Sequence, residues 1–119
     1  MEIKVQKDSN DIYLVELSGS LDLYSSNQLK ELIMKLIESR IECIIINLTD
    51  TDAINSSGIG ALIYVSSTLR KLNCPLILVM PEGPIVQILE ATRLRIYFTV
   101  VPTVKEALVL AAAAGNAKG

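Results

Sequence analysis

The first part of the chain carries two short apolar runs joined by turn residues. In residues 2–7 apolar positions alternate with charged ones, which indicates a strand with one face in water. Residues 12–17 form a second apolar run, and Asn10 and Asp11 between the two runs are typical turn residues. The pattern predicts a hairpin of two strands, and Gly19 is expected to end the second strand.

A helical repeat follows the hairpin. Ser25 followed by Gln28 matches the spacing of a capping box and predicts a helix that begins there. Apolar residues then recur every three or four positions, with lysines and glutamates between them, as in a helix that packs one face on a core. The apolar stripe consists of Leu29, Leu32, Ile33, Leu36 and Ile37.

The middle of the chain contains its longest apolar run. Residues 43–48 are almost continuously apolar, which is typical of a strand covered on both faces in a parallel sheet. Residues 49–56 are polar and are expected to form a loop. A second helix is predicted from near Ile59 to about Leu72, with Asn73 as its end.

The last third repeats the alternation of strand and helix. Residues 76–79 predict a buried strand, and Pro84 suits the first position of a short helix. Residues 97–101 predict a last short strand, at an edge of the sheet. A second capping box at residues 103–106 begins a helix that is expected to run towards Gly115.

The element order β-β-α-β-α-β-α-β-α predicts an α/β fold. A hairpin that leads into alternating strands and helices gives a mixed sheet of four to five strands with helices packed on it. The length of 119 residues corresponds to one domain, which we place at residues 1–114. Residues 115–119 are expected to be a disordered tail.

Composition excludes several classes of protein. Half of the residues are apolar, but with four tyrosines, one phenylalanine and no tryptophan the core must be aliphatic. Eleven basic and 13 acidic residues give a net charge of −2, which argues against a nucleic-acid binder. No apolar run is long enough to cross a membrane, and no leader is visible, so we expect a cytoplasmic protein. Cys43 and Cys74 are expected to be reduced core residues.

The chain has no histidine, and this absence weakens most enzyme hypotheses. Histidine is the commonest metal ligand and the commonest general base. Asp50 and Asp52 form a carboxylate pair that could hold Mg²⁺, but no third ligand converges on them in the sequence, and solvation of a loop explains them better. We therefore predict no metal site and no catalytic residues.

The segment from Asn55 to Gly60 is the strongest candidate for function. It lies between a predicted strand and a predicted helix, where backbone N–H groups and the Ser56 hydroxyl meet at one exposed point. Ser56 could be a helix N-cap and nothing more. It could also be a serine that is phosphorylated, because a helix N-terminus favours a phosphate. The residues alone leave both possibilities open.

Two glycines and an aspartate near this serine have more than one explanation. Gly58 and Gly60 permit close packing of the helix on the sheet, or the approach of a partner. Their spacing does not match a phosphate-binding loop, because no lysine follows Gly60. Asp22, just before the first helix, is explained by itself as a turn or capping acid.

Three segments of the chain together resemble a known family. They are Leu17-Ser18-Gly19-Ser20-Leu21-Asp22, the run Ile44-Ile45-Ile46-Asn47-Leu48, and Ile54-Asn55-Ser56-Ser57-Gly58-Ile59-Gly60-Ala61-Leu62. In order and length the chain is similar throughout to anti-sigma factor antagonists of the STAS domain family. The resemblance implies a protein that binds an anti-sigma factor, which is also a serine kinase, and so frees a sigma factor.

The resemblance also implies the roles of individual residues. The kinase would use ATP to phosphorylate Ser56, and a serine phosphatase would reverse this, so the protein itself needs no cofactor. The docking surface would surround Ser56, with the exposed parts of residues 20–26 and 57–64 as its rim. Its named members are Asp22, Asn55, Ser57, Gly58, Ile59 and Gly60. A simple antagonist of this kind is expected to be a monomer, and neither nucleic acid nor a membrane is expected as partner.

The chain departs from the family pattern at two positions. Asn55 stands where relatives usually carry aspartate. Asparagine keeps a carbonyl acceptor but lacks the negative charge. Arg93 stands where relatives often carry glycine, so a positive φ there would strain the backbone.

Two other functions are alternatives to the antagonist. One is a STAS scaffold subunit of a signalling assembly, which would self-associate. The other is a small nucleotide-binding or receiver-like domain. A receiver would carry an aspartate at the end of a central strand, where this chain has Asn47 and Leu48.

Overall fold

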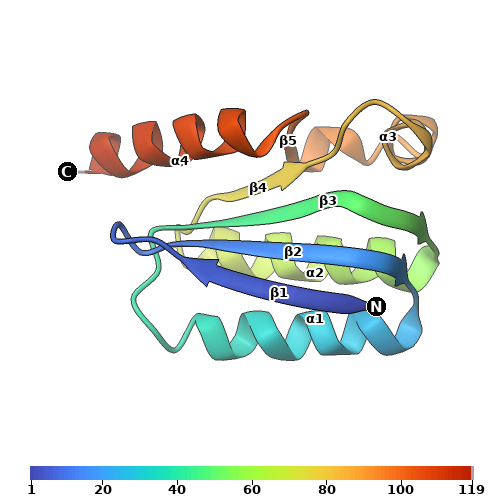
Figure 1. Ribbon diagram of the computed structural model, residues 1–119, viewed down its shortest axis with the longest axis horizontal. Helices are drawn as coiled ribbons and strands as arrows, with labels where there is room; N and C mark the ends of the chain where they lie inside the picture. Colours follow the sequence, from blue (N-terminus) through green and yellow to red (C-terminus); the bar gives the residue numbers. More distant parts are fainter. Residues whose placement is uncertain (119) are drawn as a thin grey trace.

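A single five-stranded sheet organises the molecule. The computed structural model describes the backbone of residues 1–118 and the side chains of residues 1–113. Helices pack on both faces of the sheet (Figure 1). The elements are β1 (Glu2–Lys7), β2 (Ile12–Leu21), α1 (Leu23–Leu36), β3 (Cys43–Ile54), α2 (Ser56–Lys71), β4 (Leu76–Val79), α3 (Pro84–Ala91), the 3₁₀ turn η1 (Arg95–Tyr97), β5 (Thr99–Val101) and α4 (Val104–Lys118).

The strands lie in the order in which they occur along the chain. The sheet order is β1-β2-β3-β4-β5. β1 pairs antiparallel with β2, and every later pair is parallel. A parallel neighbour needs a crossover connection, which α1, α2 and α3 supply in turn. The predicted α/β fold with a mixed sheet is therefore confirmed, with five strands.

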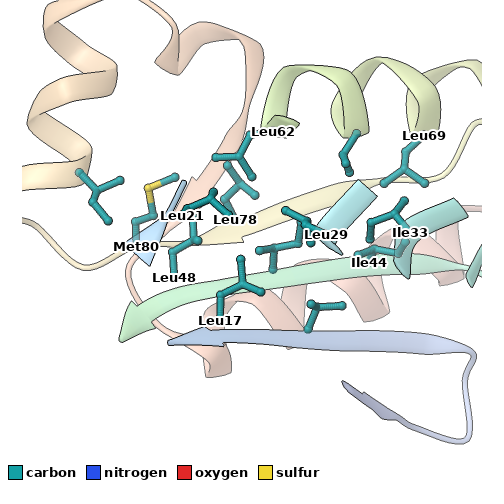
Figure 2. Close-up of a cluster of buried hydrophobic side chains, with 14 of the residues drawn as sticks. Leu17, Leu21, Leu29, Ile33, Ile44, Leu48, Leu62, Leu69, Leu78 and Met80 are labelled. Carbon is teal, nitrogen blue, oxygen red and sulfur yellow. The ribbon is translucent and has the colours of Figure 1, made fainter. Parts of the chain in front are cut away.

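Two aliphatic cores lie on opposite faces of the sheet. The larger core joins the sheet to α1, α2 and α3, and Figure 2 shows part of it. The side chains labelled there are Leu17, Leu21, Leu29, Ile33, Ile44, Leu48, Leu62, Leu69, Leu78 and Met80. The smaller core lies under α4, where Ala107 and Ala111 pack near Ile45, Ile77 and Val79. The run at residues 43–48 is buried by both cores, as its continuous apolar character predicts.

β2 and β3 continue past the points where the sequence predicts that they end. Gly19 does not stop β2; it adopts φ +102° and sits at one of two register shifts against β3. Residues 49–54 belong to β3, so the expected loop is wrong. Their polar side chains lie in water, whereas the buried Thr51 hydroxyl donates to the carbonyl of Leu17 at 3.2 Å. The extension therefore exists because β2 and β3 support each other as a bulged ribbon.

The predicted starts of two helices are wrong by a few residues. α1 is capped by Asp22 rather than Ser25, and α2 is capped by Asn55 rather than Ser56. α2 begins at Ser56, three residues before the expected Ile59. In each case the N-cap is the first residue after a strand, since the chain turns directly from strand to helix.

The ends of α2 and α3 agree with the sequence. Leu72 is the C-cap of α2, and Asn73 follows with φ +56°. Arg93 follows α3 with φ +61°. The positive φ that glycine would tolerate is therefore present at Arg93, which carries the cost of a left-handed conformation in a residue with a Cβ.

The last segment differs in detail from the expectation. Residues 95–97 form η1, so β5 is limited to three residues. Thr103 caps α4, accepting a hydrogen bond from the Glu106 N–H at 3.2 Å. The helix extends to Lys118 rather than ending near Gly115. The expected disordered tail, 115–119, lies outside the residues whose side chains are described, and it stays a prediction.

Candidate functional site

The N-termini of α1 and α2 lie side by side at one end of the sheet. Leu21 and Ile54, the last residues of β2 and β3, are register partners on parallel strands. Each strand turns into its helix after one further residue, so Asp22 and Asn55 occupy equivalent positions. The Asn55 N–H donates to the carbonyl of Leu21 at 3.3 Å and ties the two turns together. Figure 1 shows both helices starting at the end where the β2 and β3 arrows point.

The start of α1 is closed by a complete capping box. The Asp22 carboxylate accepts from the Ser25 N–H at 3.0 Å and from the Ser25 hydroxyl at 3.0 Å. The Asp22 N–H donates to the Ser25 hydroxyl oxygen at 2.8 Å. The backbone N–H of Ser25, and next its hydroxyl, hold the pKa of the Asp22 carboxyl below its usual value. Asp22 is therefore an ionised cap, and Ser25 is buried.

The start of α2 is more open. The Asn55 side-chain oxygen accepts from the Gly58 N–H at 3.0 Å. Ser56 is the first helical residue and is exposed. Within the described residues its hydroxyl makes no side-chain hydrogen bond. Because Asn55 provides the cap, the Ser56 hydroxyl is not needed to cap the helix and stays exposed.

The two glycines in the first turn of α2 have different surroundings. A Cβ on Gly58 would lie 2.6 Å from the Leu21 carbonyl oxygen and 2.7 Å from Cγ1 of Ile54. A Cβ on Gly60 would meet nothing within 4 Å. Gly58 is therefore required for close packing against the end of β2, whereas Gly60 leaves an exposed bare patch of helix backbone.

Comparison with known proteins identifies the family. A family model described as the STAS domain matches residues 2–107. The chain belongs to the STAS domain family. This result confirms the family resemblance that the sequence segments indicated.

Solved structures show that the fold is shared with anti-sigma factor antagonists and with a transporter protein. An antagonist from Mycobacterium paratuberculosis has 19% identity and a TM-score of 0.77, with 93% of each chain covered. The phosphorylated form of the Bacillus cell fate determinant SpoIIAA has 19% identity and a TM-score of 0.71, covering 90% of this chain and 96% of its own. A sulfate transporter family protein from Wolinella succinogenes has 17% identity and a TM-score of 0.80, covering 92% and 90%.

In this STAS domain, exposed apolar side chains lie on α1 and on α2, the helix that Ser56 begins. Leu23 and Tyr24, in the first turn of α1, are 64% and 74% exposed. On α2, Ile63 and Tyr64 are 40% and 48% exposed. Large exposed apolar side chains on neighbouring helices are typical of a protein-docking surface. They lie within the ranges that the sequence analysis marked, although the pattern did not single out these side chains.

Of the other predicted site residues, Gly60 alone is exposed. Ser57 and Ile59 are half-buried, and Gly58 is buried. The structure thus brings Asp22, Asn55 and Ser56 together at the surface and leaves Gly58 as a packing residue.

Two interactions near the site were not predicted from the sequence. The Ser20 hydroxyl donates to the Asp52 carboxylate at 3.1 Å, which joins β2 to β3. The Lys30 ammonium lies 5.5 Å from the centre of the Tyr64 ring and links α1 to α2. Neither contact has a signal in the local sequence, because each joins residues more than 30 positions apart.

The carboxylates near the site are not gathered for a metal ion. Asp50 and Asp52 are exposed on β3. Among the residues that the structure describes, no three histidine, cysteine, aspartate or glutamate side chains are placed to hold a metal. In the same part of the chain, no helix is both long and apolar enough to cross a lipid bilayer.

Proposed function

We propose that this STAS domain is an anti-sigma factor antagonist whose binding to an anti-sigma factor serine kinase is controlled by phosphorylation of Ser56. The observation that carries the proposal is the placement of Ser56. Its hydroxyl is exposed at the start of α2 and makes no hydrogen bond with the residues that the structure describes, and both α1 and α2 carry exposed apolar side chains. Membership of the STAS family and the fold of a phosphorylated SpoIIAA support this choice over a receiver-like domain.

A phosphate on Ser56 would be tolerated by the fold. A phosphoserine carries a charge of about −1.5 to −2 at pH 7 and adds strong acceptor oxygens. At the first position of α2, these oxygens lie near the free N–H groups and the positive end of the helix dipole. We therefore expect the modified domain to keep its structure.

The same phosphate would oppose docking. In the unmodified state, Leu23, Tyr24 and Ile63 offer apolar area that a partner can bury. A phosphate amid these side chains would have to be desolvated on binding, beside the ionised Asp22 carboxylate. Binding would weaken without any change in the fold, so that one modification would release the partner.

This function requires little of the protein itself. We propose that it is not an enzyme, that ATP enters only as the substrate of the kinase, and that a serine phosphatase restores the free hydroxyl. The setting of such a circuit is the cytoplasm.

Phosphorylation with the cognate kinase tests the proposal. The protein would be incubated with the kinase and ATP, and the modified residue located by mass spectrometry. Ser56→Ala should abolish incorporation, whereas Ser57→Ala, the matched change at the neighbouring hydroxyl, should retain it. Phosphate found at another residue, or Ser56→Ala still modified, would contradict the assignment.

A further inference from the structure

The outer surface of α4 differs from that of the other long helices. From Ala107 to Ala117 the sequence contains no charged residue. Three consecutive apolar residues are well exposed there: Leu108 at 41%, Val109 at 64% and Leu110 at 41%. A helix that is apolar around most of its circumference is usually buried. α4 instead lies alone on its face of the sheet, with its outer side open (Figure 1).

Three described side chains of α4, those of Val104, Ala107 and Ala111, join the core on this face of the sheet. Its fully buried side chains, among those described, are Ala107 and Ala111. These small groups let the helix lie close to β3 and β4. Leu108, Val109 and Leu110 lie outside this core, and their exposed parts have no partner among the described residues of the single chain.

A hollow lies beside these exposed residues. It has a volume of about 580 Å³ and is lined by residues of β5, of the first turns of α4 and of the turn between them. Val101, Val109 and Leu110 supply its apolar lining, together with Thr103. Lys105 and Glu106 complete the lining with one charge of each sign.

We propose that α4 and β5 form an isologous interface between two copies of this chain. One surface carries both a projecting apolar side chain, Val109, and a hollow able to receive such a group. The same surface carries a lysine next to a glutamate, so a two-fold axis near the first turn of α4 pairs Lys105 of each copy with Glu106 of the other. Self-complementarity of shape and of charge is the property that a two-fold interface needs.

Other occupants fit the surface less well. A helix that lies on a membrane carries lysine and arginine along its polar face. From Val104 to Ala113, α4 has a single lysine, and Glu106 neutralises it. A strongly charged protein partner gains nothing from a surface with no net charge.

This interface is independent of the proposed switch. α4 covers one face of the sheet, and α1 and α2 cover the other. Two copies joined through α4 leave both Ser56 hydroxyls accessible, so a dimer can still bind the kinase. The proposal departs from the monomer that the family resemblance implied.

Sedimentation equilibrium on the full chain, from micromolar to near-millimolar concentration, tests the proposal. We expect a reversible monomer–dimer equilibrium. Val109→Lys should weaken dimerisation about tenfold or more, because a charge enters an apolar contact. The matched control is Ile96→Lys, since Ile96 is 84% exposed on η1 and does not line the hollow. It should leave the dimer unchanged, and circular dichroism should show that both variants are folded.

Charge exchange identifies the second copy as the occupant. Lys105→Glu and Glu106→Lys should each weaken self-association, because each gives a surface of one sign. An equimolar mixture of the two variants should restore dimers. A chain that stays monomeric over the whole concentration range would overturn the proposal. A monomer that cosediments with lipid vesicles would overturn it too, because it would show a membrane as the partner. A dimer that Val109→Lys leaves intact would overturn it equally.

Discussion

The starts of α1 and α2 are built on the same plan but differ in how completely they are closed. Both follow paired parallel strands and both carry an Asx cap. At α1, the Asp22 carboxylate and Ser25 satisfy each other, and Ser25 is buried. At α2, Asn55 makes one capping bond and the next residue, Ser56, keeps a free, exposed hydroxyl. The complete capping box gives the first turn of α1 a structural role. The exposed hydroxyl in the first turn of α2 makes that turn a candidate site for modification.

The largest expected effect on stability distinguishes the buried Gly58 from the exposed Gly60 at the start of α2. Gly58→Ala would place a Cβ 2.6 Å from the backbone oxygen of Leu21, so the strand end must shift. We expect an overpacking cost of about 1–3 kcal/mol in the free energy of unfolding. Gly60→Ala meets nothing within 4 Å and should stabilise the domain by up to about 1 kcal/mol through helix propensity. Urea denaturation of both variants measures the difference, and equal effects would contradict the account.

The second expected effect on stability distinguishes the capping residue, Asn55, from the proposed phosphorylation site, Ser56. Asn55→Ala removes the acceptor of the Gly58 N–H and should cost about 0.5–2 kcal/mol in unfolding free energy. Ser56→Ala removes a hydroxyl that makes no hydrogen bond with the described part of the chain, so its effect on stability should lie within about 0.5 kcal/mol. Thermal unfolding checks both. If Ser56→Ala were as destabilising as Asn55→Ala, Ser56 would be a structural cap.

The smallest expected effect is a pH dependence confined to the α1 turn. The pKa of Asp22 is lowered in the folded state, so its ionised form stabilises the fold above the unfolded pKa. That contribution is lost as the pH falls through the folded pKa. The melting temperature of Asp22→Asn should therefore lie below that of the unchanged protein at neutral pH, and the gap should narrow in acid.

Asn55 provides the control for that measurement, because its side chain does not titrate. The deficit of Asn55→Ala should stay constant over the same pH range. A gap for Asp22→Asn that is unchanged in acid would show that its carboxylate charge is not what holds the α1 turn.

The sequence pattern predicted the fold well, because the apolar periodicity that defines each element is also what the two cores bury. It failed where tertiary pairing outweighs local character. Residues 49–54 look like a loop, but they are a strand because β2 runs beside them. The same pairing decides the caps: Asn55 follows Ile54 directly, so it takes the cap and Ser56 becomes the first helical residue.

The candidate site could be located from the sequence, but the separate roles of its residues could not be predicted. The strand-to-helix segment and its serine are visible as a motif. That Gly58 is a packing residue and Gly60 is not depends on Leu21, which is far away along the chain. The apolar side chains of Leu23 and Tyr24 have no periodic signal, because exposure of single residues depends on how α1 lies against α2.

The most direct test of the central claim is the affinity of the kinase for a domain with a charge at Ser56. Calorimetric titration would compare the unchanged domain with Ser56→Asp and with Ser67→Asp, which adds the same charge to another exposed position of α2. Ser56→Asp should fold normally and bind at least about tenfold more weakly, a loss of about 1.4 kcal/mol or more, while Ser67→Asp binds as before. Equal affinity of Ser56→Asp and the unchanged domain would contradict the claim.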